Sequence, residues 1–158
     1  MKKGSIWDLL IFILGAELVG AISGIISGSS GGIYTDFAQP PLAPPAWVFP
    51  VVWVVLYALM GVSAYLVYSS QAEQPRINRA LMLYALQLFV NFWWSIIFFR
   101  FELLLGSVIT IFILLVLVAL MIISFVRVKP SAAYLNLPYL VWLAFAAYLN
   151  IGILVLNS

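Results

Sequence analysis

The sequence predicts an all-α protein, a five-helix transmembrane bundle in which a long first connecting loop acts as a lid. Three observations support this prediction: the 158 residues are 66% hydrophobic, only 8% are charged, and five apolar stretches are long enough to cross a bilayer. Soluble domains are typically about 45–50% apolar and about 25% charged. A domain of this length cannot bury so much apolar surface, so a soluble globule and a disordered chain are both excluded.

The five apolar stretches follow one another along the chain. We expect one membrane domain over residues 1–158, with spans at about 6–27, 46–68, 79–99, 103–126 and 132–156. The first stretch contains Asp8 and Glu17 and is followed by no clear cleavage site, so we interpret it as a retained helix rather than a signal peptide. Pro138 removes a backbone hydrogen bond inside the last stretch, where we therefore expect a kink.

The basic residues predict how the helices are oriented in the membrane. With five spans, one side receives Lys2, Lys3, Arg76, Arg79, Arg127 and Lys129. The opposite side receives Arg100 alone. Because basic side chains are retained on the cytoplasmic side, we expect a multi-pass protein of the plasma membrane of a prokaryote. Its N-terminus should be cytoplasmic and its C-terminus outside.

The first connection, residues 28–45, is much longer than the others and has a biased composition. It begins with glycine and serine and ends in a stiff, extended segment that contains Pro40, Pro41, Pro44 and Pro45. A long ordered loop in a compact protein is usually functional, so we favour a lid over a simple tether.

Three spans carry stripes of aromatic and small or polar residues at intervals of three or four. The stripes contain Phe49, Trp53 and Tyr57 in the second span, Gln87, Asn91, Trp94 and Ser95 in the third, and Trp142, Ala146 and Asn150 in the fifth. Polar side chains avoid lipid, so the stripes should face the interior, whereas Trp93, turned by about 100° from Trp94, should face lipid. The pattern alone is equally consistent with a ligand pocket and with core packing.

Glu17 lies near the centre of the first span, where an ionisable group is costly and is usually functional. Gln87 and Asn91 should lie at a similar depth, so either of these amides could hydrogen bond a neutral carboxyl group at this position. This arrangement favours a tie between two helices over proton transport. Gly20 and Gly24 permit a close helix approach, which favours packing within the chain over a dimer interface.

Several kinds of chemistry are excluded by composition. The chain has no cysteine and no histidine, which excludes thiol catalysis, a Ser-His-Asp triad, and thiolate or imidazole metal sites. The net charge of +2 gives no reason to expect a nucleic-acid partner. We expect no cofactor and no metal, and the residues favour a binding protein over an enzyme without deciding between them.

Three segments share a pattern of aromatic, proline and polar residues with known proteins. They are YTDFAQPPLAPPAWVFPVVWVVLYALMG (residues 34–61), QLFVNFWWSIIFF (residues 87–99) and PYLVWLAFAAYLN (residues 138–150). In order and spacing these segments resemble the translocator protein family, whose members are also called tryptophan-rich sensory proteins or peripheral-type benzodiazepine receptors. The resemblance covers about residues 33–157 and implies a five-helix membrane bundle that often forms homodimers.

The resemblance also implies a receptor or carrier that binds porphyrin or another tetrapyrrole-like molecule in a cavity beneath the first loop. Transferred by motif position, the ligand-binding residues would be Tyr34, Pro44, Phe49, Trp53, Tyr57, Asn91, Trp94, Ser95, Trp142, Ala146 and Asn150. Trp and Tyr rings could stack on a flat macrocycle, while Asn and Ser could hydrogen bond its carboxylates. Since the chain offers no His or Cys as an axial ligand, metal-free porphyrin is favoured over haem.

Two alternative functions stay open. Some family members are linked to light-dependent porphyrin breakdown, and the resemblance assigns that chemistry to Trp53 and Trp142. The chain could also be a passive transporter or a structural partner of another membrane protein. It departs from the family pattern where Ile33 replaces a Trp and Gln39 replaces a Lys, which removes one ring and one partner for a ligand carboxylate. Tyr148 is followed by no basic residue, so the sterol-binding pattern of some animal members is not transferred.

Overall fold

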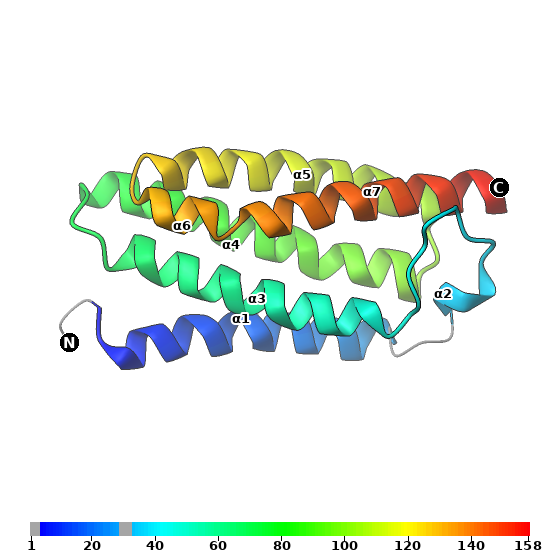
Figure 1. Ribbon diagram of the computed structural model, residues 1–158, viewed down its shortest axis with the longest axis horizontal. Coiled ribbons are helices and arrows are strands. Elements are labelled where there is room, and N and C mark those ends of the chain that lie inside the picture. Colours follow the sequence, from blue (N-terminus) through cyan, green and yellow to red (C-terminus); the bar gives the residue numbers. More distant parts are fainter. Residues whose placement is uncertain (1–3, 29–32) are drawn as a thin grey trace.

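The computed structural model describes residues 4–28 and 33–158, and this part of the chain contains five helices long and apolar enough to cross a membrane. They are α1 (Ile6–Ser27), α3 (Val48–Tyr68), α4 (Gln74–Ser95), α5 (Leu104–Val126) and α7 (Leu137–Asn157), arranged as an elongated bundle (Figure 1). Two short helices, α2 (Ile33–Asp36) and α6 (Pro130–Tyr134), and a π-helical turn (Ile96–Arg100) connect them. The predicted all-α, five-helix bundle is confirmed.

The first span begins and ends where the sequence predicts, because both ends carry capping residues. The Ser5 hydroxyl accepts a hydrogen bond from the Asp8 backbone N–H (3.2 Å), and the Asp8 carboxylate accepts one from the Ser5 backbone N–H (3.0 Å). At the other end Gly28 adopts the left-handed conformation, with φ at 67°, that closes many helices. These local contacts fix the length of α1.

The third span begins earlier than its apolar run predicts. We expected it from about residue 79, whereas α4 begins at Gln74. Pro75 lies in the first turn, where its missing N–H removes no helical hydrogen bond. The polar first turn of α4 is therefore helical, although its composition did not indicate a membrane span.

The last span consists of two helices, so the expected kink within one helix at Pro138 is wrong. The chain leaves α6 at Leu135 and Asn136, and Pro138 lies in the first turn of α7. The Asn136 side chain donates hydrogen bonds to the Ser63 hydroxyl (2.7 Å) and to the Ala132 carbonyl (3.0 Å). These bonds stabilise the break within the apolar interior, where unpaired polar groups are costly.

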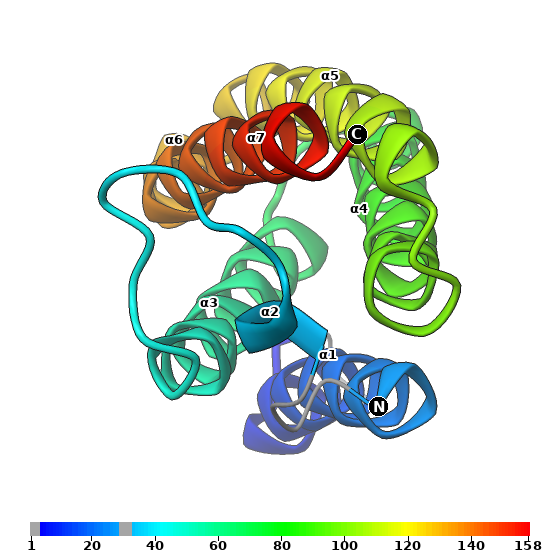
Figure 2. The same cartoon turned by 90° about the vertical axis from the view of Figure 1, so that its right-hand side faces the viewer.

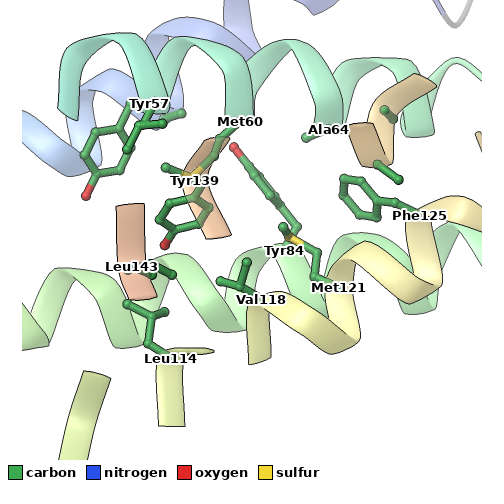
Figure 3. Packing of buried hydrophobic residues seen from close by; sticks show 14 of the residues in the cluster. Tyr57, Met60, Ala64, Tyr84, Leu114, Val118, Met121, Phe125, Tyr139 and Leu143 are labelled. Atoms are coloured by element: carbon green, nitrogen blue, oxygen red, sulfur yellow. The ribbon is translucent and has the colours of Figure 1, made fainter. Parts of the chain in front are cut away.

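The apolar core lies among α3, α4, α5 and α7 (Figure 3). Its fully buried side chains include Met60, Leu114, Val118, Met121, Phe125 and Leu143. Tyr139 is also fully buried, and its hydroxyl donates to Gln87 Oε1 (2.7 Å) and accepts from the Asn91 amide (2.8 Å). Paired in this way, the three polar groups are tolerated inside the core.

The first connecting loop crosses the end of the bundle that carries the C-terminus, runs out toward α7 and returns to α3 (Figure 2). Tyr148 donates a hydrogen bond to the Pro41 carbonyl (2.6 Å), and the Asn157 side chain pairs with the backbone of Ala38 (2.9 and 3.0 Å). Pro40 packs against Gly152, where an added Cβ would lie 2.5 Å from the Pro40 ring. The loop is thus held on α7 at several points.

The positions of the basic residues agree with the expected grouping. Arg76 and Arg79 lie in the first turns of α4, and Arg127 and Lys129 lie between α5 and α6, at the bundle end opposite the C-terminus (Figure 1). Arg100 lies toward the other end and donates to the Ile26 carbonyl (3.0 Å). Lys2, Lys3 and residues 29–32 of the loop fall outside the described residues, as does the side chain of Ile33, and the membrane orientation stays a prediction.

Candidate ligand-binding cavity

A cavity of about 880 Å³ lies between α1, α3 and α4, close to the bundle end that the loop crosses. Three structural groups form its wall: one face of α1, the first half of α3 with the loop residues before it, and the end of α4. The lining residues are Glu17, Gly20, Ala21, Ser23, Gly24, Ile25, Gly28, Tyr34, Ala46, Trp47, Phe49, Pro50, Trp53, Val54, Tyr57, Asn91, Trp94, Ser95 and Phe99.

The cavity exists because α1 presents small residues to α3. The two helices touch where Gly61 meets the backbone of Ile13 and where Gly20 meets the ring of Tyr57, each closely enough that an added Cβ would lie within 2.4–2.6 Å. Beyond this contact, Ala21 and Gly24 have no large side chain to fill the space toward α3. Gly20 therefore packs within the chain, whereas Gly24 lines the cavity.

Aromatic rings form the wall opposite α1. The Trp53 ring lies 5.7 Å from that of Tyr57 and 6.0 Å from that of Trp94, measured between ring centroids. Nearer the loop, the Tyr34 ring packs edge-on against Phe49 at 4.8 Å. This arrangement gives a planar apolar ligand several ring faces on which to stack.

Most polar side chains of the wall are already hydrogen bonded to the protein. Ser95 donates to the Ser27 hydroxyl (3.2 Å), and Ser23 donates to the Phe92 carbonyl (2.8 Å). Asn91 is engaged by the Tyr139 hydroxyl. Partly satisfied hydroxyls of this kind can still accept a hydrogen bond from a ligand.

Glu17 also lines this wall, and it differs from Ser23, Asn91 and Ser95 in its contacts. The amides of Gln87 and Asn91 hydrogen bond Tyr139, and neither reaches the Glu17 carboxyl, so the expected tie between these helices is wrong. Helix rotation explains the difference, because Gln87 faces the core side of α4, where it is fully buried. Within the described residues, no hydrogen bond or ion pair to Glu17 occurs.

The rim of the cavity is apolar and exposed. Ile25 of α1, Trp47 at the start of α3 and Val54 of α3 are 80%, 68% and 59% exposed. These apolar side chains border the gap between α1 and α3.

A model of the TspO/MBR family matches residues 11–156 of this chain. The chain belongs to the TspO/MBR family. Among its relatives, Tryptophan-rich protein TspO of Chlorobaculum tepidum is 37% identical over 124 residues, which cover 78% of each chain. Protein CrtK of Rhodobacter capsulatus is 31% identical, with 93% of this chain and 91% of the relative covered. Translocator protein of Ovis aries is 34% identical, with 79% and 75% covered. The resemblance seen in the three motifs is confirmed at the level of the family.

The structure brings many of the residues implied by the TspO/MBR motifs into this one cavity. They are Tyr34, Phe49, Trp53, Tyr57, Asn91, Trp94 and Ser95. As the stripe pattern predicts, Trp94 is buried, with 4% of its surface exposed, whereas Trp93 is 41% exposed. Their role in binding a ligand stays a prediction.

The other four motif residues lie outside the cavity wall. Trp142 borders a separate apolar groove between α3 and α7, where it packs edge-on against Phe49 at 5.7 Å. Asn150 accepts a hydrogen bond from the indole N–H of Trp94 (3.3 Å) and so fixes the position of that ring without lining the cavity itself. Ala146 is buried, and the Pro44 carbonyl accepts from the Tyr34 hydroxyl (3.3 Å).

Sequence reasoning missed the contribution of α1 to the wall. Ala21, Ser23 and Gly24 line the cavity, although the spacing of small residues was interpreted only as a packing motif. A helix face made of small residues indicates either a close helix partner or an empty volume, and the sequence alone cannot separate the two. Both occur here, at successive turns of the same helix.

Proposed function

We propose that this TspO/MBR protein is a membrane receptor or carrier for porphyrin or another tetrapyrrole-like molecule. The observation that carries the proposal is the aromatic cavity of about 880 Å³ beneath the first loop. Pockets for drug-sized ligands span about 300–1,000 Å³. The volume therefore lies at the upper end of this range, which suits a large planar ring system.

The wall supports a specific arrangement of such a ligand. The macrocycle would stack on Trp53, Tyr57 and Trp94, whose rings come from two helices. Its carboxylate edge would point toward the loop, where the hydroxyls of Ser95 and Ser27 lie. Stacking supplies most of the affinity, while hydrogen bonding at the edge sets the orientation.

The loop would serve as the lid of this site. Its bonds to α7 hold it over the bundle end, and Tyr34 links its first part to Pro44. Burial raises the pKa of the Tyr34 hydroxyl, so this group stays protonated and keeps donating through neutral and mildly alkaline pH. A lid fixed in this way slows release more than it slows binding, because release must break the anchoring contacts first.

The test is a titration of protoporphyrin into the purified protein in lipid nanodiscs. Binding predicts saturable quenching of tryptophan fluorescence, together with a shift of the porphyrin absorption band. Protein-free nanodiscs give the contribution of partitioning into lipid. Quenching that rises without saturation refutes the proposal, because the porphyrin would then only dissolve in the bilayer.

Light-dependent porphyrin breakdown is the alternative that one observation favours. The Trp53 ring lies in the cavity wall and is 6.0 Å from Trp94 and 6.1 Å from Tyr139, so a porphyrin bound there would meet oxidisable rings. Illumination of the bound complex would then consume the porphyrin with turnover, whereas a receptor or carrier would leave it intact. Flux of porphyrin across proteoliposomes separates transport from sensing, and chemical cross-linking tests the homodimer that the resemblance implies.

A further inference from the structure

We propose that Glu17 and the Tyr57 hydroxyl select ligands that carry a protonated amine on an aromatic or apolar body. The inference rests on the proposed function in so far as it uses the same cavity. It adds the chemical group by which the cavity distinguishes one large apolar ligand from another.

Glu17 is placed at a depth where a carboxyl group needs a partner. It lies near the middle of α1, about 15 Å from either end by the helical rise. It lines the cavity and is partly buried, and no hydrogen bond or ion pair with another described residue involves it. An ionisable group within a membrane span normally pairs with a neighbour or marks a ligand path, and here the space beside it is the cavity.

Tyr57 supplies a second polar group at the same place. Its ring rests on Gly20, one turn beyond Glu17 on the same face of α1, and both Tyr57 and Glu17 line the cavity. Among the described residues, nothing hydrogen bonds the Tyr57 hydroxyl, although the ring is nearly buried. A carboxylate and a phenol oxygen together can accept two of the three N–H bonds of an ammonium group.

The aromatic wall suits a cation as well as a planar ring. Trp53 and Tyr57 present neighbouring ring faces to the cavity, with centroids 5.7 Å apart, and ammonium groups are attracted to such faces. Within the described part of the chain, no basic side chain lines the cavity. All five described basic residues, namely Arg76, Arg79, Arg100, Arg127 and Lys129, are exposed near the helix ends. The described part of the chain thus places no positive charge beside Glu17, whereas the amine of a ligand would supply one.

The same carboxylate disfavours the acidic part of a ligand at this depth. A porphyrin would consequently keep its carboxylate edge toward the loop and away from Glu17. An amine-bearing amphiphile would instead place its head at Glu17 and its rings on Trp53 and Trp94. Because opposite charges attract more strongly in a medium of low dielectric than in water, the preference for the amine should be at least about tenfold.

The experiment compares two fluorescent probes that share the dansyl ring and alkyl chain and differ in the charge of the end group. Dansylcadaverine carries a primary amine on an alkyl chain, and N-acetyl-dansylcadaverine carries a neutral amide in its place. Both probes accept energy from tryptophan, and this energy transfer measures binding. The nanodiscs contain phosphatidylcholine, whose surface has no net charge that would attract the amine. The variants are Glu17→Gln, Glu17→Asp and the control Glu73→Gln, whose carboxylate pairs with Arg76 at the end of the bundle remote from the cavity.

We expect the wild type and Glu73→Gln to bind the amine at least about tenfold more tightly than the amide. Glu17→Gln should bind both probes equally, and Glu17→Asp should keep part of the preference, because its carboxylate is present but set back by one methylene. Circular dichroism and size-exclusion chromatography verify that each variant is folded. If Glu17→Gln does not fold, the wild-type ratio and the intermediate ratio of Glu17→Asp decide the matter.

Parallel titration of the wild type with protoporphyrin separates this inference from the proposed function. Saturable porphyrin binding without any preference for the amine overturns the role of Glu17 and leaves the proposed function standing. Preference for the amine without porphyrin binding overturns the proposed function and leaves the role of Glu17 standing. Failure of all probes to bind overturns both, and a preference that survives Glu17→Gln overturns the assignment to Glu17.

Discussion

Replacing Trp53 tests the cavity most directly, because its ring contacts two other rings of the aromatic wall. Its ring lies within 5.7–6.1 Å of Tyr57, Trp94 and Tyr139. Trp53→Ala removes one protein ring on which the ligand would stack, which costs about 0.5–1.5 kcal/mol of binding free energy. About 40 Å² of lost apolar contact adds about 1 kcal/mol. The sum of about 1.5–2.5 kcal/mol corresponds to binding weaker by roughly ten- to seventyfold.

Trp53→Phe sharpens the test, because it keeps a ring and most of the apolar area. We expect its affinity for protoporphyrin to fall by less than about threefold, which is less than about 0.7 kcal/mol. The assay is the saturable quenching titration in nanodiscs, with circular dichroism to confirm that each variant is folded.

Trp7→Ala provides the control, since Trp7 is 68% exposed in the first turn of α1 and lies outside the cavity. Equal losses of affinity in Trp7→Ala and Trp53→Ala would refute the placement of the ligand in this cavity. So would a Trp53→Ala variant that folds and binds as tightly as the wild type.

Three further predictions follow from the lid, the helix contacts and the basic residues. Tyr148→Phe removes one anchor of the loop, worth about 1 kcal/mol, and should accelerate porphyrin release about fivefold in stopped-flow measurements; unchanged release would make the loop a tether. Gly61→Ala places a Cβ 2.6 Å from the Ile13 backbone and should lower stability by about 1–3 kcal/mol, whereas Gly15→Ala, with nothing within 4 Å, should not; equal melting temperatures would contradict this. A reporter fused after Ser158 should be active only outside the cytoplasm, and cytoplasmic activity would reverse the orientation.

The apolar pattern of this sequence predicts the bundle well because each span must by itself be apolar and long enough to cross the bilayer. The run from Ile6 to Ser27 is both apolar and capped, so its limits follow from local chemistry alone. Trp94 and Trp93 are equally hydrophobic, yet the polar neighbours of Trp94 at helical spacing correctly place it inside and Trp93 outside. Periodicity was sufficient wherever one face of a helix differs clearly from the other.

The site was predicted less completely, because rotation and separation of helices depend on the whole bundle. Gln87 and Glu17 lie at a similar depth, but Tyr139 takes the amide, and no feature of either span indicates this. The motif position of Trp142 suggests the cavity, whereas the structure places it in the groove between α3 and α7. Pro138 is compatible with a kink and with a new helix, and the hydrogen bonds of Asn136 decide for the latter.

The helix α1 lies at the periphery of the bundle, where it contributes little to the apolar core but much of the cavity wall. Only 11% of its apolar window is buried, against 33–39% in the other four spans, so the core scarcely depends on its side chains. Yet α1 supplies Glu17 and the small residues that leave the cavity empty. Under the proposed function, mutations on the cavity face of this helix would change ligand preference without altering the core side chains of the other four spans. Exchange of α1 between related chains would then be a short route to new specificities, in evolution or by design.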